Sequence, residues 1–128
     1  MTDEEAIRRV LALTCQLRDD SRYDLWCELF CEDGTFTYLD QRLEGRAAIR
    51  AHMEENFFPS VGKHLCLNNV IDVEGDRARA VSDFVKLQPA PAGGLYPIAT
   101  GRYDDHLIRA SGGAWRISSR RVEILRAS

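Results

Sequence analysis

The sequence predicts an α+β fold in which helices come first and strands follow. Apolar residues recur at helical spacing in the first part of the chain, whereas long β-prone runs separated by turn residues begin at Gly62. This order indicates a curled sheet that wraps the helices rather than a parallel βαβ sheet. A chain of 128 residues with 45% hydrophobic content can bury one ordinary core. We therefore expect a single domain, residues 1–128.

The N-terminal part predicts two helices followed by a strand. Thr2 and Glu5 have the spacing of a capping box, and the apolar periodicity after them predicts a helix to about Arg18. The stretch YDLWCELF (23–30) places its aromatic residues on one side of a short second helix. Gly34 is expected to end this helix, because the β-prone residues TFTY come directly after it.

A third helix and a four-stranded meander complete the expected fold. The stretch EGRAAIRAHMEENFF (44–58) returns to helical spacing, and Pro59 is expected to end it. Its expected inner stripe consists of Ala48, Ile49, His52 and Met53. Turn residues then separate four long β-prone runs, which predict an antiparallel meander: 63–75, 77–88, 96–109 and 114–125.

Charge and composition narrow the possible partners. The formal net charge is −3, and both signs are scattered along the chain, so we expect neither a nucleic-acid partner nor a polybasic membrane contact. The acidic, amphipathic start MTDEEAIRRV matches no signal or transit peptide, and no apolar run approaches spanning length. We therefore expect a cytoplasmic protein that binds no membrane.

The cysteines lack the paired spacing of metal-binding motifs. In a reducing compartment they are expected to be small buried hydrophobic residues, so we expect no metal site. Cys27 and Cys31 are one helical turn apart, and Cys66 shares a strand face with His64. A zinc site is therefore the less favoured interpretation. The residues are Cys15, Cys27, Cys31 and Cys66.

The segment KHLCLNN (63–69) contains the first candidate functional residue. Because strand side chains alternate, His64, Cys66 and Asn68 are expected on one face, and Leu65 and Leu67 on the other. The histidine then either points into water or lines a polar pocket within the fold. Alternation alone leaves both possibilities open.

The chain resembles the SnoaL-like group of the nuclear transport factor 2-like superfamily. The segments that carry the resemblance are YDLWCELFCEDGTFTY, LEGRAAIRAHM and DDHLIRASGGAWRISSRRV, which occur in this order and span nearly the whole chain. The resemblance implies a cone-shaped, cystatin-like α+β barrel in which helices and a mostly antiparallel sheet enclose one deep pocket. Members of the superfamily include dehydratases, isomerases, cyclases, a dehydrochlorinase and proteins that only bind or assemble, so the fold does not settle the function.

The resemblance also implies catalytic residues. In the branch that contains scytalone dehydratase, an aspartate beyond the first helix pairs with a histidine on the first meander strand, and Asp19 and His64 match these positions. Arg120 matches a last-strand arginine that contacts the substrate or leaving group, and Tyr38 matches a tyrosine that helps to hold a water. Strict alternation would place Arg120 opposite Trp115, unless a β-bulge reverses the choice.

Other positions depart from the family pattern. Thr14 replaces a tyrosine or lysine that is catalytic in several members, and Gln88 and Asp104 fall near a pocket histidine and a pocket asparagine. Tyr38 occupies the position of the aspartate base in ketosteroid isomerases, so that mechanism is not supported. Tyr23 has the spacing of a core residue. Together with Asn68 on the strand face of His64, these positions give five candidate substrate contacts: Tyr38, Thr14, Tyr23, Asn68 and Asp104.

An aspartate and a histidine in contact could act as a general base. The carboxylate fixes the tautomer of the imidazole and stabilises the imidazolium that forms. Together with Arg120, such a pair predicts a lyase, dehydratase-like or dehydrohalogenase-like, that acts on a small cyclic or polycyclic compound and requires no cofactor. The alternatives are a non-catalytic module that binds a small hydrophobic molecule or a partner, and a polyketide cyclase or isomerase. Asp19 could also be a solvated residue beside Asp20.

The strands carry apolar residues at positions that one small core does not obviously cover. These residues predict a homo-oligomer, a dimer or a trimer. They are Leu65, Leu67, Val81, Val85, Ile98, Leu107, Ile117 and Val122.

Overall fold

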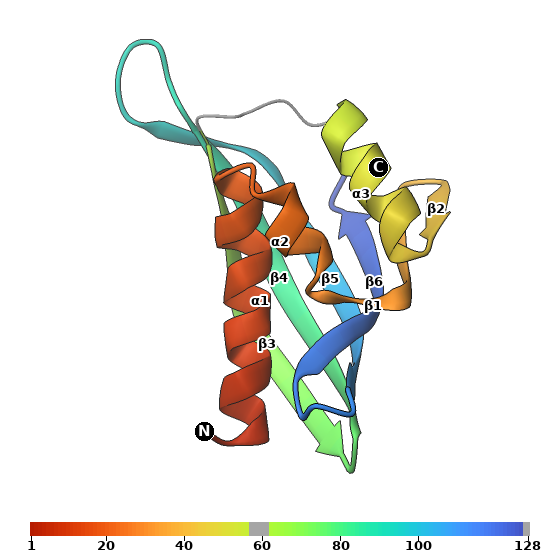
Figure 1. Ribbon diagram of the computed structural model, residues 1–128. Coiled ribbons are helices and arrows are strands. Elements are labelled where there is room, and N and C mark those ends of the chain that lie inside the picture. The colour runs from red at the N-terminus through yellow and green to blue at the C-terminus, as the bar shows by residue number, and fades with distance from the viewer. Residues whose placement is uncertain (57–61, 127–128) are drawn as a thin grey trace.

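The computed structural model describes residues 1–56 and 62–126 and confirms the α+β class. Its helices lie on one face of a curled sheet (Figure 1). The helices are α1 (Asp3–Asp19), α2 (Tyr23–Cys27) and α3 (Arg46–Asn56). The strands are β1 (Phe30–Tyr38), β2 (Gln41–Glu44), β3 (Lys63–Glu74), β4 (Arg77–Pro89), β5 (Leu95–Arg109) and β6 (Trp115–Ile124).

The six described strands form one mixed sheet in the order β2-β1-β6-β5-β4-β3. The meander from β3 to β6 is antiparallel, as predicted, and β1 pairs with β6 in parallel. The short strand β2, which the sequence analysis did not anticipate, pairs with β1. Among the described strands, β2 and β3 are the two edges. The sheet therefore curls around the helices but does not close into the barrel that the resemblance implied.

Helix α1 begins at the predicted capping box. The Thr2 hydroxyl accepts from the Glu5 N–H at 3.1 Å, and the Glu5 carboxylate accepts from the Thr2 N–H at 2.9 Å. These bonds satisfy backbone donors that a helix N-terminus otherwise leaves unpaired. None of the described helices is long and apolar enough to cross a membrane.

The step from α2 to β1 differs from the prediction. The helix ends at Cys27 and the strand begins at Phe30, so Gly34 lies inside β1 and does not end a helix. A Cβ at Gly34 would lie 3.0 Å from the carbonyl oxygen of Cys31 and 3.2 Å from that of Ile117. Glycine is therefore needed there for a close backbone approach beside an irregularity in the β1–β6 pairing.

Helix α3 is shorter than the predicted segment. It runs from Arg46 to Asn56, and Pro59 lies outside the described residues. Ile49 and Met53 are buried as predicted, whereas Ala48 is exposed and was wrongly placed in the inner stripe. The inner face is thus narrower than the apolar pattern indicated.

Irregularities in the strand pairing of the meander change which residues face the helices. The β3–β4 register shifts between Leu67 and Val70, where Asn68 has a φ of 53°. The β5–β6 register shifts as well, so that Ile117 and Arg120 are both buried although their spacing along β6 is odd. Each extra residue reverses the alternation beyond it. The bulge that would turn Arg120 inward is therefore present.

A buried ion pair joins β5 to β6 on the inner face. The Arg120 Nε and Nη2 donate to the two Asp105 carboxylate oxygens at 2.8 and 2.9 Å. The side chains are only 3% and 0% exposed. Burial opposes the charge of Arg120, but the paired carboxylate of Asp105 outweighs it and raises the pKa of the guanidinium above its ordinary value.

Replacement of Asp105 should therefore be strongly destabilising. Asp105→Ala leaves a buried guanidinium without its partner, and we expect the free energy of unfolding to fall by about 3–5 kcal/mol. Its neighbour Asp104 pairs with the exposed Arg79, so Asp104→Ala should cost less than about 1 kcal/mol. Urea denaturation of the two variants checks this, and equal losses would contradict it.

The outer face of the sheet carries apolar side chains at the β3 edge. Leu65, Leu67 and Val70 are exposed, and cross-strand pairing places Val85 and Val81 beside Leu65 and Val70. Three of the apolar strand residues behind the oligomer prediction are covered by the core of the chain itself: Leu107, Ile117 and Val122. We propose that the apolar corner of β3 and β4 associates with a second copy of the chain.

Light scattering tests this association. We expect a mass above the 14.5 kDa of one chain at micromolar concentration. Leu67→Glu, which places a charge in the apolar corner, should shift the protein towards the monomer. Arg121→Glu, at an exposed position of β6 opposite the outward-facing Asp104, is the control. A monomeric wild-type protein would refute the proposal.

Candidate functional site

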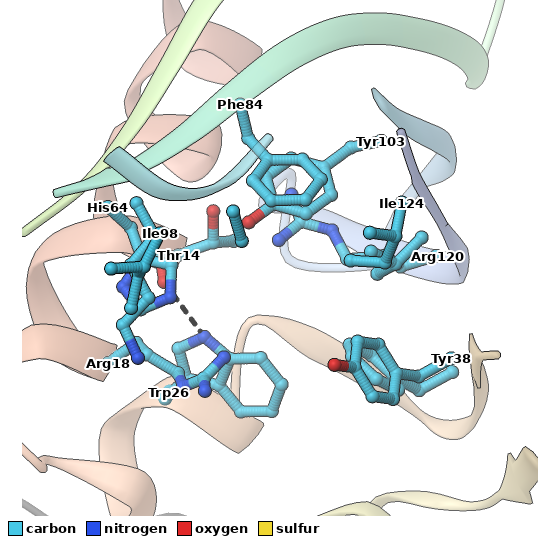
Figure 2. A pocket seen from close by; sticks show the side chains of 14 residues that line it. Thr14, Arg18, Trp26, Tyr38, His64, Phe84, Ile98, Tyr103, Arg120 and Ile124 are labelled. Atoms are coloured by element: carbon cyan, nitrogen blue, oxygen red, sulfur yellow. Dashed lines mark hydrogen bonds between the residues drawn. The ribbon is translucent and has the colours of Figure 1, made fainter. Parts of the chain in front are cut away.

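A cavity of about 240 Å³ lies between the first two helices and the inner face of the sheet (Figure 2). The walls are mainly apolar and aromatic, with a few polar groups that converge from different elements. The polar lining residues are Thr14, Arg18, Tyr38, His64, Lys86, Tyr103 and Arg120; the others are Trp26, Phe36, Phe84, Ile98, Ala99, Val122 and Ile124. An apolar enclosure with few polar groups is typical of a small-molecule site.

Asp19 and His64 are in contact at one side of this cavity. The Asp19 Oδ1 lies 2.6 Å from the His64 Nδ1, and the two carboxylate oxygens accept from the His64 backbone N–H at 3.1 and 3.0 Å. The side chains are 5% and 9% exposed. An ionised carboxylate only accepts, so the Nδ1 carries the proton of a neutral imidazole and the Nε2 holds the lone pair.

The surroundings of His64 favour its neutral form. Burial lowers the pKa of His64 below 6.5, and the positive charges of Arg18 and Lys86 lower it further. The hydrogen bond and the charge of Asp19 act in the opposite direction. Since burial prevails, the imidazole is available as a base at neutral pH.

Arg120 lies across the cavity from His64, against a pair of aromatic rings (Figure 2). The rings of Phe84 and Tyr103 stack with centroids 4.5 Å apart, and the Arg120 guanidinium lies 4.1 Å from the Tyr103 centroid. Burial raises the pKa of Tyr103, so its hydroxyl stays protonated. Gly101 is needed mainly because a Cβ there would clash with the backbone carbonyl of Glu123 on β6, and the same Cβ would lie 2.9 Å from the Phe84 ring.

Two further predicted contacts line the cavity. Tyr38 comes from the end of β1 and Thr14 from α1. The Thr14 hydroxyl donates to the Leu11 carbonyl at 2.6 Å, and the Thr14 carbonyl accepts from the Trp26 Nε1 at 3.0 Å. Thr14 therefore orients an aromatic wall of the cavity as well as contributing to the lining.

Three predicted substrate contacts lie elsewhere. Asn68 is exposed and its amide donates to Asp83 at 3.0 Å, because the bulge in β3 turns it to the outer face. Asp104 also faces outward, where it pairs with Arg79. Tyr23 packs against the core and is not among the residues that line the cavity. The structure brings none of these three residues into the cavity lining, and the inward acid of β5 is Asp105.

The sequence analysis missed Arg18 and Lys86, although signals for both were present. Arg18 follows Thr14 by one helical turn and therefore shares its face of α1. Lys86 follows Phe84 by two positions on β4 and pairs in register with His64. Both side chains reach the cavity lining.

The described residues contain no group of three or more His, Cys, Asp or Glu side chains that could hold a metal ion. Cys15, Cys27 and Cys31 are buried, and Cys66 is half-buried rather than fully buried.

Several solved structures of other proteins share the fold of this chain. A protein of unknown function from Mycobacterium tuberculosis is 29% identical, with a TM-score of 0.89, over 98% of this chain and 73% of that one. A nuclear transport factor 2-like protein with a cystatin-like fold from Novosphingobium aromaticivorans is 26% identical, with a TM-score of 0.87, over 98% and 84%.

A scytalone dehydratase-like protein from Novosphingobium aromaticivorans is 22% identical, with a TM-score of 0.82, over 97% of this chain and 85% of that one. At this identity the similarity shows the fold alone. The sequence matches no curated protein. The model of the SnoaL-like domain matches residues 1–121, so the chain belongs to the SnoaL-like family.

Proposed function

We propose that this chain is a cofactor-independent lyase that removes water or a halide from a small cyclic compound. The observation that carries the proposal is the Asp19–His64 pair, whose imidazole lines a cavity that Arg120 also lines. A base and a fixed cation at one cavity suit a reaction in which a proton leaves carbon and negative charge develops on oxygen.

The cost of burying Asp19 supports a functional role for it. A carboxylate in the last turn of a helix opposes the helix dipole, and burial removes it from water. Neither the location at the helix C-terminus nor the burial of the carboxylate favours the stability of the fold. The backbone N–H and the Nδ1–H of His64 partly offset these costs, and the same bonds orient the imidazole.

In the proposed reaction the His64 Nε2 takes a proton from the carbon beside a substrate carbonyl. The electron pair moves onto the carbonyl oxygen as an enolate, which Arg120 stabilises and to which Tyr38 donates a hydrogen bond. The enolate then collapses, a double bond forms, and hydroxide or halide leaves the neighbouring carbon. The imidazolium returns its proton to the departing hydroxide as water, or to solvent when halide leaves.

Substitution of the pair should separate catalysis from folding. In a screen of cyclic β-hydroxy and β-halo ketones, followed by absorbance of the conjugated product, His64→Ala should lose about 100- to 10,000-fold in kcat/KM. Asp19→Asn should also lose activity, because it removes the group that fixes the tautomer. The controls Asp20→Asn and His106→Ala alter exposed residues of the same types.

Retained turnover in both pair variants would refute the lyase proposal. Apolar ligands that bind equally well to wild type and both variants, without turnover, would favour the binding module instead. Cyclisation or isomerisation of a substrate without loss of water or halide would favour the third alternative.

The pH profile tests the protonation state of the base. The neutral imidazole is the active form, so kcat/KM should fall as the pH drops, with a midpoint below the ordinary value of 6.5. Asp19 raises the pKa of His64, so in Asp19→Asn the midpoint of the residual activity should move lower still. A midpoint above 6.5 in the wild type would contradict the assignment.

A further inference from the structure

Two cysteines meet where helix α1 packs along the edge strand β3 (Figure 1). Cys15 belongs to α1 and Cys66 to β3, and both line a surface groove that follows this contact. Cys15 is buried and Cys66 is half-buried. The proposed reaction uses neither thiol, so the pair is a candidate for chemistry of its own.

Hydrogen bonds at two places fix how α1 lies along β3. Asp19, the last residue of α1, accepts the His64 backbone N–H at 3.0 Å near the start of β3. Nearer the start of the helix, the Arg8 Nη1 donates to the Asn69 Oδ1 at 3.3 Å. The helix and the strand therefore run in opposite directions, and their side chains meet in matching order between these two contacts.

The two cysteines lie at the same level within this alignment. Cys15 precedes Asp19 by four residues, which is about 6 Å along the helix. Cys66 follows His64 by two residues, which is about 7 Å along the strand on the same face. The irregularity of β3 begins only after Leu67, so it does not turn Cys66 away. The geometry thus places a second pair of side chains one helical turn from the Asp19–His64 pair.

The two thiols have different surroundings. A side-chain hydrogen bond with Cys15 lowers the pKa of Cys66, and the Ser82 hydroxyl and the charge of Arg120 lower it further, against the effect of burial. The same hydrogen bond and burial raise the pKa of Cys15. The Asn69 Nδ2 also donates to the Cys66 Sγ at 3.5 Å. These donors favour the thiolate at Cys66, which is the nucleophilic form, while Cys15 keeps its proton.

The other two cysteines provide an internal comparison. Cys27 and Cys31 are buried, and burial is the main cause that raises the pKa of each thiol. A buried thiol that keeps its proton is a poor nucleophile. We therefore expect them to react more slowly than Cys66.

We propose that Cys66 and Cys15 form an oxidation site for a peroxide, where Cys66 reacts first and Cys15 then closes a disulfide within the chain. The Cys66 thiolate attacks one peroxide oxygen: an S–O bond forms, the O–O bond breaks, and the departing hydroxide takes a proton to become water. The product at Cys66 is a sulfenic acid.

The second step links the helix to the strand. The Cys15 sulfur attacks the Cys66 sulfur, so that an S–S bond forms and the S–O bond breaks. The departing hydroxide takes the proton of Cys15 and leaves as a second water. The two thiols lose two hydrogen atoms in all, and the peroxide is reduced to two waters. The inference does not depend on the proposed lyase reaction, and its test requires no substrate.

Peptide mapping after oxidation tests the proposal. The wild-type protein is treated with hydrogen peroxide at pH 7, and the remaining thiols are blocked with N-ethylmaleimide in urea. Trypsin releases Cys15 in peptide 10–18 and Cys66 in peptide 64–77, whereas the other two cysteines share peptide 23–42. Mass spectrometry should show the first two peptides joined, with the loss of two hydrogen atoms, and the third carrying two maleimides. Dithiothreitol should reverse the link.

Single variants assign the order of the two steps. In Cys15→Ala the sulfenic acid at Cys66 has no partner, so dimedone should label peptide 64–77. In Cys66→Ala we expect neither a link nor a dimedone label at Cys15. Cys31→Ala, which removes another buried cysteine, is the matched control and should form the link as the wild type does. Circular dichroism checks that each variant is folded.

Three results would overturn the proposal. The first is a folded wild-type protein whose four thiols are all blocked by maleimide after peroxide treatment. The second is a disulfide that forms only between two chains, which a non-reducing denaturing gel detects. The third is dimedone labelling of Cys15 in Cys66→Ala that equals the labelling of Cys66 in Cys15→Ala.

Discussion

The structure depends on the Asp19 carboxylate, which joins the end of α1 to the edge strand β3. It accepts the backbone N–H and the Nδ1–H of His64, so one side chain holds a strand edge in place and fixes an imidazole tautomer. The position is electrostatically poor for a carboxylate, at a helix C-terminus and nearly buried. The hydrogen bonds that compensate for this electrostatic cost come from His64, the same residue that the carboxylate orients.

The sequence predicted the order of the main elements and the capping box at Thr2, and the family resemblance implied the pair of Asp19 and His64. The bulges limited what it could predict, because one extra residue in a strand reverses the face of every side chain beyond it. Asn68 is the example in β3: strict alternation groups it with His64, but at a φ of 53° it starts the irregularity and faces Asp83 outside. Consecutive asparagines in a β-prone run were the available signal, since asparagine tolerates this backbone conformation better than most residues.

Asp105 shows the opposite case, in which alternation held and the resemblance misled. Tyr103, Asp105 and Leu107 alternate on β5 and all three are buried, while Asp104 between them faces outward to Arg79. The period-two pattern of β5 therefore indicated the inward acid. The buried position of its partner Arg120 follows only from the resemblance and the bulge together, because neither alone places a buried guanidinium on the face of Ile117.

The charge of Arg120 is balanced within the fold, and this balance decides what the residue can do at the cavity. Arg120 is held by a carboxylate behind it, so it can stabilise charge that appears during a reaction while adding no unbalanced charge beforehand. In the proposed reaction His64 lies across the cavity from Arg120, so one bound orientation places the substrate carbon next to the base and the carbonyl oxygen next to the cation.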